Sequence, residues 1–174
     1  MPVLESKLDT RDDTFQKNKS DMVDMLGEIQ ALLDEAAEGG GEEAMQRLAS
    51  RGKMPIRERI AAVLDRDSPF LEISPLAAWR SPFAIGSGFV VGIGTIEGVE
   101  CVILGHDPSV RAGAFNSFNS KKLMRGLELA RDNRLPYVQF VESAGADLRG
   151  EGGGDPEAAI QREIGHFAES GRLF

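Results

Sequence analysis

Hydrophobic residues recur at steps of three, four and seven along the first part of the chain. Between Asp13 and Ala37 they mark one stripe on a helix, at Phe15, Met22, Leu26, Ile29, Leu33 and Ala36. Three glycines follow at positions 39–41, where a helix cannot continue cheaply. A second, short helix is expected over residues 42–50. Residues 1–50 are therefore predicted to form an N-terminal helical arm, docked on another surface rather than folded alone.

The hydrophobic pattern changes in the second part of the chain. Helical spacing returns after Pro55, a residue that suits the first position of a helix. The stretch "GFVVGIGTIEGVECVILGHD" (88–107) is typical of two strands joined by a turn at Glu97 and Gly98. A helix is expected over about residues 119–133, followed by the strand "YVQFVE" (137–142). The nearly continuous apolar run in that strand predicts a sheet covered on both faces.

A last helix is predicted from Asp155, with its apolar positions at Ile160, Ile164 and Phe167. Its pattern is still running at the final residue, Phe174. The series of two strands, helix, strand and helix indicates an α/β fold, and its interruption predicts an incomplete domain.

Composition and charge narrow the classes of protein. The 174 residues carry a formal net charge of −8, which argues against a nucleic-acid partner. No apolar run is long enough for a membrane span, and the polar first residues do not resemble a secretory signal. The single cysteine, Cys101, allows no internal disulfide and is expected to be buried. We therefore expect a cytoplasmic protein with no membrane partner. His106 and His166 are too few and too scattered to suggest a metal site.

The stretch "PYVQFVESAGADLRG" (136–150) is the first candidate site, and it has two interpretations. In one, Ser143 is a nucleophile, although Val141 stands where the pattern G-x-S-x-G has its first glycine. The bases available to it are His106 or His166, oriented by Asp107 or Asp155.

In the other interpretation the backbone does the chemistry. Ser-Ala-Gly-Ala after a strand frees several N–H groups, and the small side chains of Ala144 and Gly145 leave space above them. Two converging N–H groups can hold an oxyanion. A plain tight turn, with Ser143 bonding locally, is the structural alternative.

The second candidate site is "DPSVRAGAFNSFNSKK" (107–122), where small residues at 112–114 let a ligand approach the backbone. Arg111 lies beside them and belongs to a local basic cluster suited to phosphates, with Lys121, Lys122 and Arg125. A solvated helix face is the alternative for the last three. The glycines of 92–98 lie in the predicted hairpin and do not open a helix, so they give no dinucleotide-binding motif.

Three blocks together resemble the carboxyltransferase (β) subunit of biotin-dependent acyl-CoA carboxylases. They are "GKMPIRERIAAVLDRDSPFLEI" (52–73), "GIGTIEGVECVILGHDPSVRAGAFNSFNSKKLMRGLELARDNRLPYVQFVESAGADL" (92–148) and "GHFAESGRLF" (165–174). The resemblance covers about residues 47–174. Where that family usually has D-x-x-V-x-G-G and D-S-G-G-A, this chain has D-P-S-V-R-A-G and E-S-A-G-A.

The resemblance implies a crotonase-like (ClpP/crotonase) fold, a spiral of strand–strand–helix turns, with residues 51–174 forming part of its N-terminal domain. It also implies that a carboxyl group passes from carboxybiotin to the α-carbon of an acyl-CoA through an enolate held by a backbone oxyanion hole. The hole maps onto Ala144 and Gly145, and the substrate contacts map onto Arg111, Ala112, Gly113, Ser143 and Ala146.

The implied cofactor is biotin on a partner protein, with no metal. The implied partners are the acyl-CoA, a biotin carboxylase or biotin carrier subunit, and further copies of this subunit. Alanine at 144 in place of glycine requires a negative φ there, and alanine at 112 changes the loop on the CoA side. A subunit of a related acyl-CoA or malonate decarboxylase, or a non-catalytic assembly module, are the alternatives. A family subunit has two such domains and is much longer, so this chain alone is expected to be an inactive fragment.

Overall fold

The computed structural model describes residue 6, residues 8–147 and the isolated positions 157, 161, 164, 165, 168 and 172. Two helices, α1 (Asp13–Glu38) and α2 (Glu42–Ser50), come first. The remaining elements follow in the order α3 (Ile56–Val63), β1 (Leu71–Glu72), β2 (Phe89–Ile96), β3 (Val99–His106), η1 (Arg111–Gly113), α4 (Ser117–Asn133) and β4 (Tyr137–Phe140). This order confirms the predicted helical arm and the strand–strand–helix–strand series.

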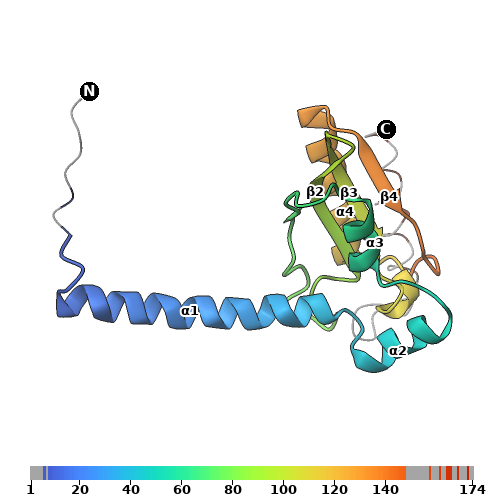
Figure 1. Ribbon diagram of the computed structural model, residues 1–174. Helices are drawn as coiled ribbons and strands as arrows, with labels where there is room; N and C mark the ends of the chain where they lie inside the picture. Colours follow the sequence, from blue (N-terminus) through green and yellow to red (C-terminus); the bar gives the residue numbers. More distant parts are fainter. Residues whose placement is uncertain are drawn as a thin grey trace.

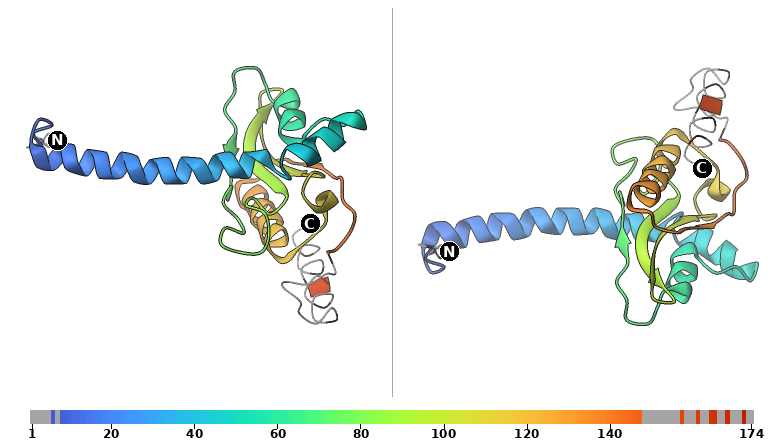
Figure 2. Two further views of the ribbon diagram at one scale, coloured as in Figure 1. Left: turned by 90° about the horizontal axis from the view of Figure 1, so that it is seen from below. Right: turned by 90° about the horizontal axis from the view of Figure 1, so that it is seen from above.

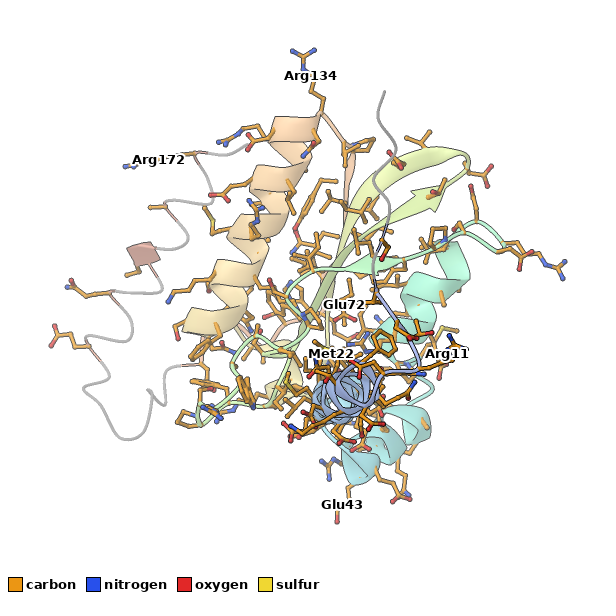
Figure 3. The ribbon with its side chains drawn as sticks, turned by 90° about the vertical axis from the view of Figure 1, so that its left-hand side faces the viewer. Arg11, Met22, Glu43, Glu72, Arg134 and Arg172 are labelled. Atoms are coloured by element: carbon orange, nitrogen blue, oxygen red, sulfur yellow. The ribbon has the colours of Figure 1, made fainter. Side chains whose placement is uncertain are left out.

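Helix α1 projects far beyond the rest of the molecule (Figures 1 and 2). Much of its apolar stripe is uncovered, because Met22, Leu26 and Ile29 are 54%, 55% and 46% exposed. Figure 3 looks along this helix and shows side chains, Met22 among them, radiating from it. Only its C-terminal end contributes to the core, through Ala36, among the described residues. The predicted docking surface for the stripe is therefore not supplied by the described part of this chain.

The four strands form one sheet in the order β1-β2-β3-β4. β2 and β3 are an antiparallel hairpin, while β3 and β4 are parallel, with Val102 opposite Tyr137 and Gly105 opposite Phe140. The hairpin turn falls at the predicted Glu97 and Gly98, both with positive φ. Asp65, which follows α3, accepts both of their amide hydrogens at 2.7 and 2.8 Å.

Helices cover both faces of the hairpin, α3 on one side and α4 on the other (Figure 3). Successive residues of β3 alternate between the two layers. Cys101 and Ile103 pack with Ile56 and Ile60 of α3, whereas Val102 and Leu104 pack with Ala130 of α4. This alternation also buries the single cysteine, as expected.

Helix α4 begins at Ser117, earlier than the predicted start at Asn119. A capping box explains the difference. Asn116 accepts the amide hydrogens of Phe118 and Asn119, and Asn119 accepts the amide hydrogen of Asn116. Asn119 is fully buried, and its side-chain amide also donates to Ser87 and Ala114 carbonyl oxygens.

The prediction for the strand over 137–142 was partly wrong. β4 ends at Phe140, all four of its residues are half-buried, and Val141 is 69% exposed. β4 lies at the end of the strand order in the described sheet, so one of its edges has no strand there. The predicted last helix falls outside the described residues, apart from helical residues at isolated positions such as Glu157 and Ile164. Among the described residues, no helix is both long and apolar enough to span a bilayer.

Candidate functional site

Two loops that are distant in sequence lie side by side at the ends of β3 and β4. The segment 142–147, which follows β4, runs beside η1 and the residues after it (Figure 1). Phe115 and Ala146 form a parallel bridge, in which the Phe115 amide donates to the Gly145 carbonyl and the Asp147 amide to the Phe115 carbonyl, both at 2.8 Å. Both candidate sites of the sequence analysis therefore meet in one place.

The backbone amides of Ala144 and Gly145 are not free donors in this structure. The Ala144 amide donates to the Ala112 carbonyl oxygen at 3.0 Å, and the Gly145 amide donates to Ser143 Oγ at 3.1 Å. Ala144 is not among the residues with positive φ, which satisfies the condition for alanine there, whereas Gly145 has φ +97°. Use of this pair as an oxyanion hole therefore requires an incoming oxygen to replace the acceptors seen here.

The loop on the other side has an unusual backbone. Arg111, Ala112 and Gly113 all have positive φ, at 47°, 53° and 68°. A Cβ at Gly113 would overlap the Glu142 carbonyl oxygen, so glycine is required for the two loops to touch. Ala112 tolerates the left-handed region at some cost in free energy.

The side chain of Ser143 bonds locally. Its hydroxyl lies 3.1 Å from the Gly145 amide and 3.5 Å from the Gly145 carbonyl, and these are its hydrogen bonds within the described residues. His106 is fully buried and stacks on Phe89 at 4.2 Å between ring centroids. Its Nε2 lies 3.1 Å from Gln139 Nε2.

Burial lowers the pKa of His106 to about 4, although a hydrogen bond to the Gly113 backbone opposes the change. A neutral, enclosed imidazole of this kind supports the fold rather than serving as a base for Ser143. His166 and Asp155, the other candidates for a serine hydrolase, lie outside the described residues.

Arg111 has a partner inside the chain. Its guanidinium Nη1 lies 2.5 Å from Asp147 Oδ2 and the group sits over the Phe83 ring at 4.6 Å. The Asp147 side chain is only 4% exposed, whereas that of Arg111 is 35% exposed. Arg111 and Ala112 also line a cavity of about 270 Å³ with Arg47 of α2 and Arg51, which directly follows α2. We call it the basic cavity (Arg47, Arg51, Arg111 and their neighbours). Residues of the arm and of the candidate site both line it.

The basic cluster predicted on α4 does not form as expected. Lys122 is 3% exposed, and its Nζ donates to the Phe89 carbonyl at 2.7 Å and lies 3.9 Å from Glu72. Burial lowers its pKa to about 8, with Glu72 opposing the change. Both interpretations of Lys122, phosphate ligand and solvated residue, are therefore wrong. Lys121 lies over the Phe118 ring and Arg125 pairs with Glu128.

Sequence reasoning missed three charged residues beside the turn. Lys53 Nζ pairs with Glu142 Oε1, and Arg59 Nη2 pairs with Glu142 Oε2 at 2.9 Å. Lys53 and Arg59 lie in the block "GKMPIRERI", so the resemblance marked the block without showing what it contacts. No local pattern in the sequence points from these cations to Glu142.

Comparison with known proteins places this geometry in a family. Residues 47–159 match the carboxyl transferase domain. The chain is 44% identical to a probable biotin-dependent acyl-coenzyme A carboxylase beta2 subunit of Mycobacterium tuberculosis, over 99% of this chain and 30% of that protein. It is 36% identical to a probable mitochondrial methylcrotonoyl-CoA carboxylase beta chain of Drosophila melanogaster, over 84% of this chain and 26% of that protein.

Solved structures agree. The β subunit of Pseudomonas aeruginosa geranyl-CoA carboxylase superposes with a TM-score of 0.83 at 29% identity, over 99% of this chain and 32% of that one. A transcarboxylase 12S structure, titled as a hexamer assembly, gives 0.67 at 27% identity, over 84% of this chain and 29% of that one. The chain thus spans about a third or less of these relatives, and it has their crotonase-like fold. The chain belongs to the carboxyl transferase domain family of the biotin-dependent acyl-CoA carboxylase β subunits.

Proposed function

We propose that this chain forms the acyl-CoA side of the carboxyltransferase component of a biotin-dependent acyl-CoA carboxylase. The observation that carries the proposal is the contact between the turn 143–146 and the loop 111–113, with the basic cavity beside them. Coenzyme A carries several phosphates, and three arginines around one cavity in an acidic chain suit such a ligand.

In this proposal the amides of Ala144 and Gly145 bind the thioester oxygen as it becomes an enolate. The oxygen would displace the Ala112 carbonyl from the Ala144 amide and the Ser143 hydroxyl from the Gly145 amide. Preorganised amide donors of this kind lower a barrier by about 3 kcal/mol each. Gly113 and Ala146 bring no large side chain to the contact between the two loops, so that a thioester can approach their backbones as the loops separate.

The residues at the turn fit a reaction that takes its base from elsewhere. Ser143 bonds to its own turn, and His106 is neutral and enclosed. Carboxybiotin, carried by a partner protein, would supply the carboxyl group and the base that removes the α-proton. What remains for this chain is to bind, orient and stabilise charge, which backbone amides and arginines do.

The proposed partners are a biotin carboxylase or biotin carrier subunit and further copies of this subunit, in the cytoplasm and in fatty acid metabolism. The uncovered stripe of α1 supports assembly with other surfaces. The decarboxylase and assembly-module alternatives are not favoured, because the curated relatives bear the names of carboxylase β subunits.

The test uses the complete subunit together with its biotin-carrying partner. Labelled bicarbonate and ATP are supplied with propionyl-CoA or 3-methylcrotonyl-CoA, and acid-stable label in the acyl-CoA product is measured. Incorporation that depends on both the acyl-CoA and the biotin partner supports the proposal. An assembled, biotinylated complex that labels no acyl-CoA of any chain length would refute it.

A further inference from the structure

We propose that Lys53 and Arg59 are positioning residues that hold the Glu142 carboxylate and so fix the amides of Ala144 and Gly145 beside the loop 111–113. The inference rests on the proposed function of that turn. It adds a set of residues, here called the Glu142 clamp (Lys53, Arg59 and Glu142), that does not touch the substrate itself.

The two cations of the Glu142 clamp bind the Glu142 carboxylate from different points of the chain. Lys53 precedes α3 and binds one carboxylate oxygen, while Arg59 of α3 binds the other. The Arg59 guanidinium is itself oriented, because its Nε donates to the Met54 carbonyl at 2.8 Å. Two cations on two oxygens restrict both the position and the rotation of a carboxylate.

The backbone of Glu142 is held as well. Its carbonyl oxygen packs against Gly113, where any side chain would overlap it. At the other end of the turn, the buried carboxylate of Asp147 pairs with Arg111 at 2.5 Å. The residues 143–146 are thus bracketed by one ion-pair system on each side, with the candidate amide donors between them.

Glu142 stays ionised over the working range of pH. The hydrogen bond from Lys53 lowers the pKa of this carboxyl below its usual value, and Arg59 adds to the effect while burial opposes it. The side chains of Lys53, Arg59 and Glu142 are 44%, 26% and 23% exposed, so solvent screens the pairs. Their contribution to global stability is therefore small, and their main effect is on local geometry.

The first arm of the test measures amide hydrogen exchange in the folded chain by NMR. Glu142→Gln keeps the shape of the side chain but removes its charge, and Lys53→Met and Arg59→Met each remove one cation. We expect the Ala144 amide to exchange about tenfold faster or more in these variants, because local opening of the turn becomes easier. Lys53→Arg, which keeps the charge, should restore slow exchange.

Arg57→Met is the matched control. Arg57 lies on the same helix as Arg59, but it pairs with Glu72 of β1, through two hydrogen bonds of 2.6 and 3.0 Å. The Arg57→Met variant should have a lower melting temperature, but amide exchange at Ala144 should not change. Equal acceleration by Arg57→Met would show that general destabilisation explains the effect, and unchanged exchange in Glu142→Gln would show that the clamp does not hold the turn. Either result overturns the proposal.

The second arm measures turnover of the complete subunit with its partner. Glu142→Gln should lower kcat about tenfold or more while the KM for acyl-CoA stays within about twofold, because misplaced donors affect the transition state more than ground-state binding. A rise in KM alone would assign Glu142 to substrate binding and overturn a positioning role. If the unaltered subunit does not carboxylate any acyl-CoA, the proposed function fails, and the exchange arm still decides whether the clamp orders the turn.

Discussion

The amide nitrogen of Ala144 donates a 3.0 Å hydrogen bond to the carbonyl oxygen of Ala112. The loop 111–113 therefore already supplies an acceptor for this amide, although Ser143, Ala144 and Gly145 are exposed. In the proposed mechanism, an acyl-CoA oxygen has to compete with the Ala112 carbonyl for this donor. Ligand binding and the separation of the two loops are consequently coupled in the proposed mechanism.

Side-chain and backbone chemistry at the turn predict opposite mutant rankings. Ser143→Ala removes a hydroxyl that accepts the Gly145 amide at 3.1 Å, and the complete enzyme should keep activity within about tenfold. Gly145→Val puts a branched side chain at φ +97°, where such residues are strained, and should lose about 100-fold or more in kcat. Steady-state carboxylation rates, with folding checked by circular dichroism, compare the two. Loss of activity in Ser143→Ala with retention in Gly145→Val would favour a serine nucleophile.

The basic cavity predicts a binding defect that can be separated from a folding defect. Arg51→Ala removes an exposed cation from the cavity wall and should raise the KM for acyl-CoA several-fold with little change in melting temperature. Arg111→Ala should also raise KM, and it should lower the melting temperature because the buried carboxylate of Asp147 loses its ion pair with Arg111. Arg66→Ala, at a 96% exposed side chain, is the matched control and should change neither. An unchanged KM in both cavity variants would remove the arginines from substrate binding.

The buried imidazole of His106 predicts a pH-dependent stability. Its pKa of about 4 in the folded chain lies below the usual histidine value of 6.5, so the unfolded chain binds more protons between these two values. Stability should therefore be full above pH 6.5 and fall as pH decreases toward 4, by up to about 3 kcal/mol over the whole range.

Urea unfolding at several pH values between 4.5 and 7.5 provides the measurement. The difference in unfolding free energy between the unaltered chain and His106→Asn isolates the imidazole from the carboxylates that titrate in the same range. This difference should grow with pH up to about 6.5 and then level off. A difference that does not depend on pH would mean that His106 is not neutral and enclosed.

The exposed stripe of α1 predicts self-association. Met22, Leu26 and Ile29 occupy one side of a projecting helix, and burying them in a contact between copies is favourable. The chain should sediment as an oligomer, and Leu26→Glu should shift it toward the monomer. Ser20→Glu adds the same charge on the opposite side of the helix, by the turn of about 100° per residue, and should have little effect. A strictly monomeric chain at high concentration would contradict the prediction.

The sequence by itself determined the elements whose signals are local. Helical spacing predicted α1 and α2 closely. The Glu97-Gly98 pair between two apolar runs placed the hairpin turn, and motif order indicated the family. It misplaced the start of α4, because the cap at Asn116 satisfies amides that periodicity does not count.

Only the tertiary structure decided which polar groups meet. Lys122 looks like a surface residue in sequence. In the structure it is buried, and its Nζ donates hydrogen bonds to backbone carbonyls of a distant loop and strand. Lys53 and Glu142 are 89 positions apart, and no periodicity relates them. The state of the Ala144 amide also depends on a loop from another part of the chain. Periodicity reports the face that a residue presents, whereas a hydrogen-bond partner depends on how separate elements pack together.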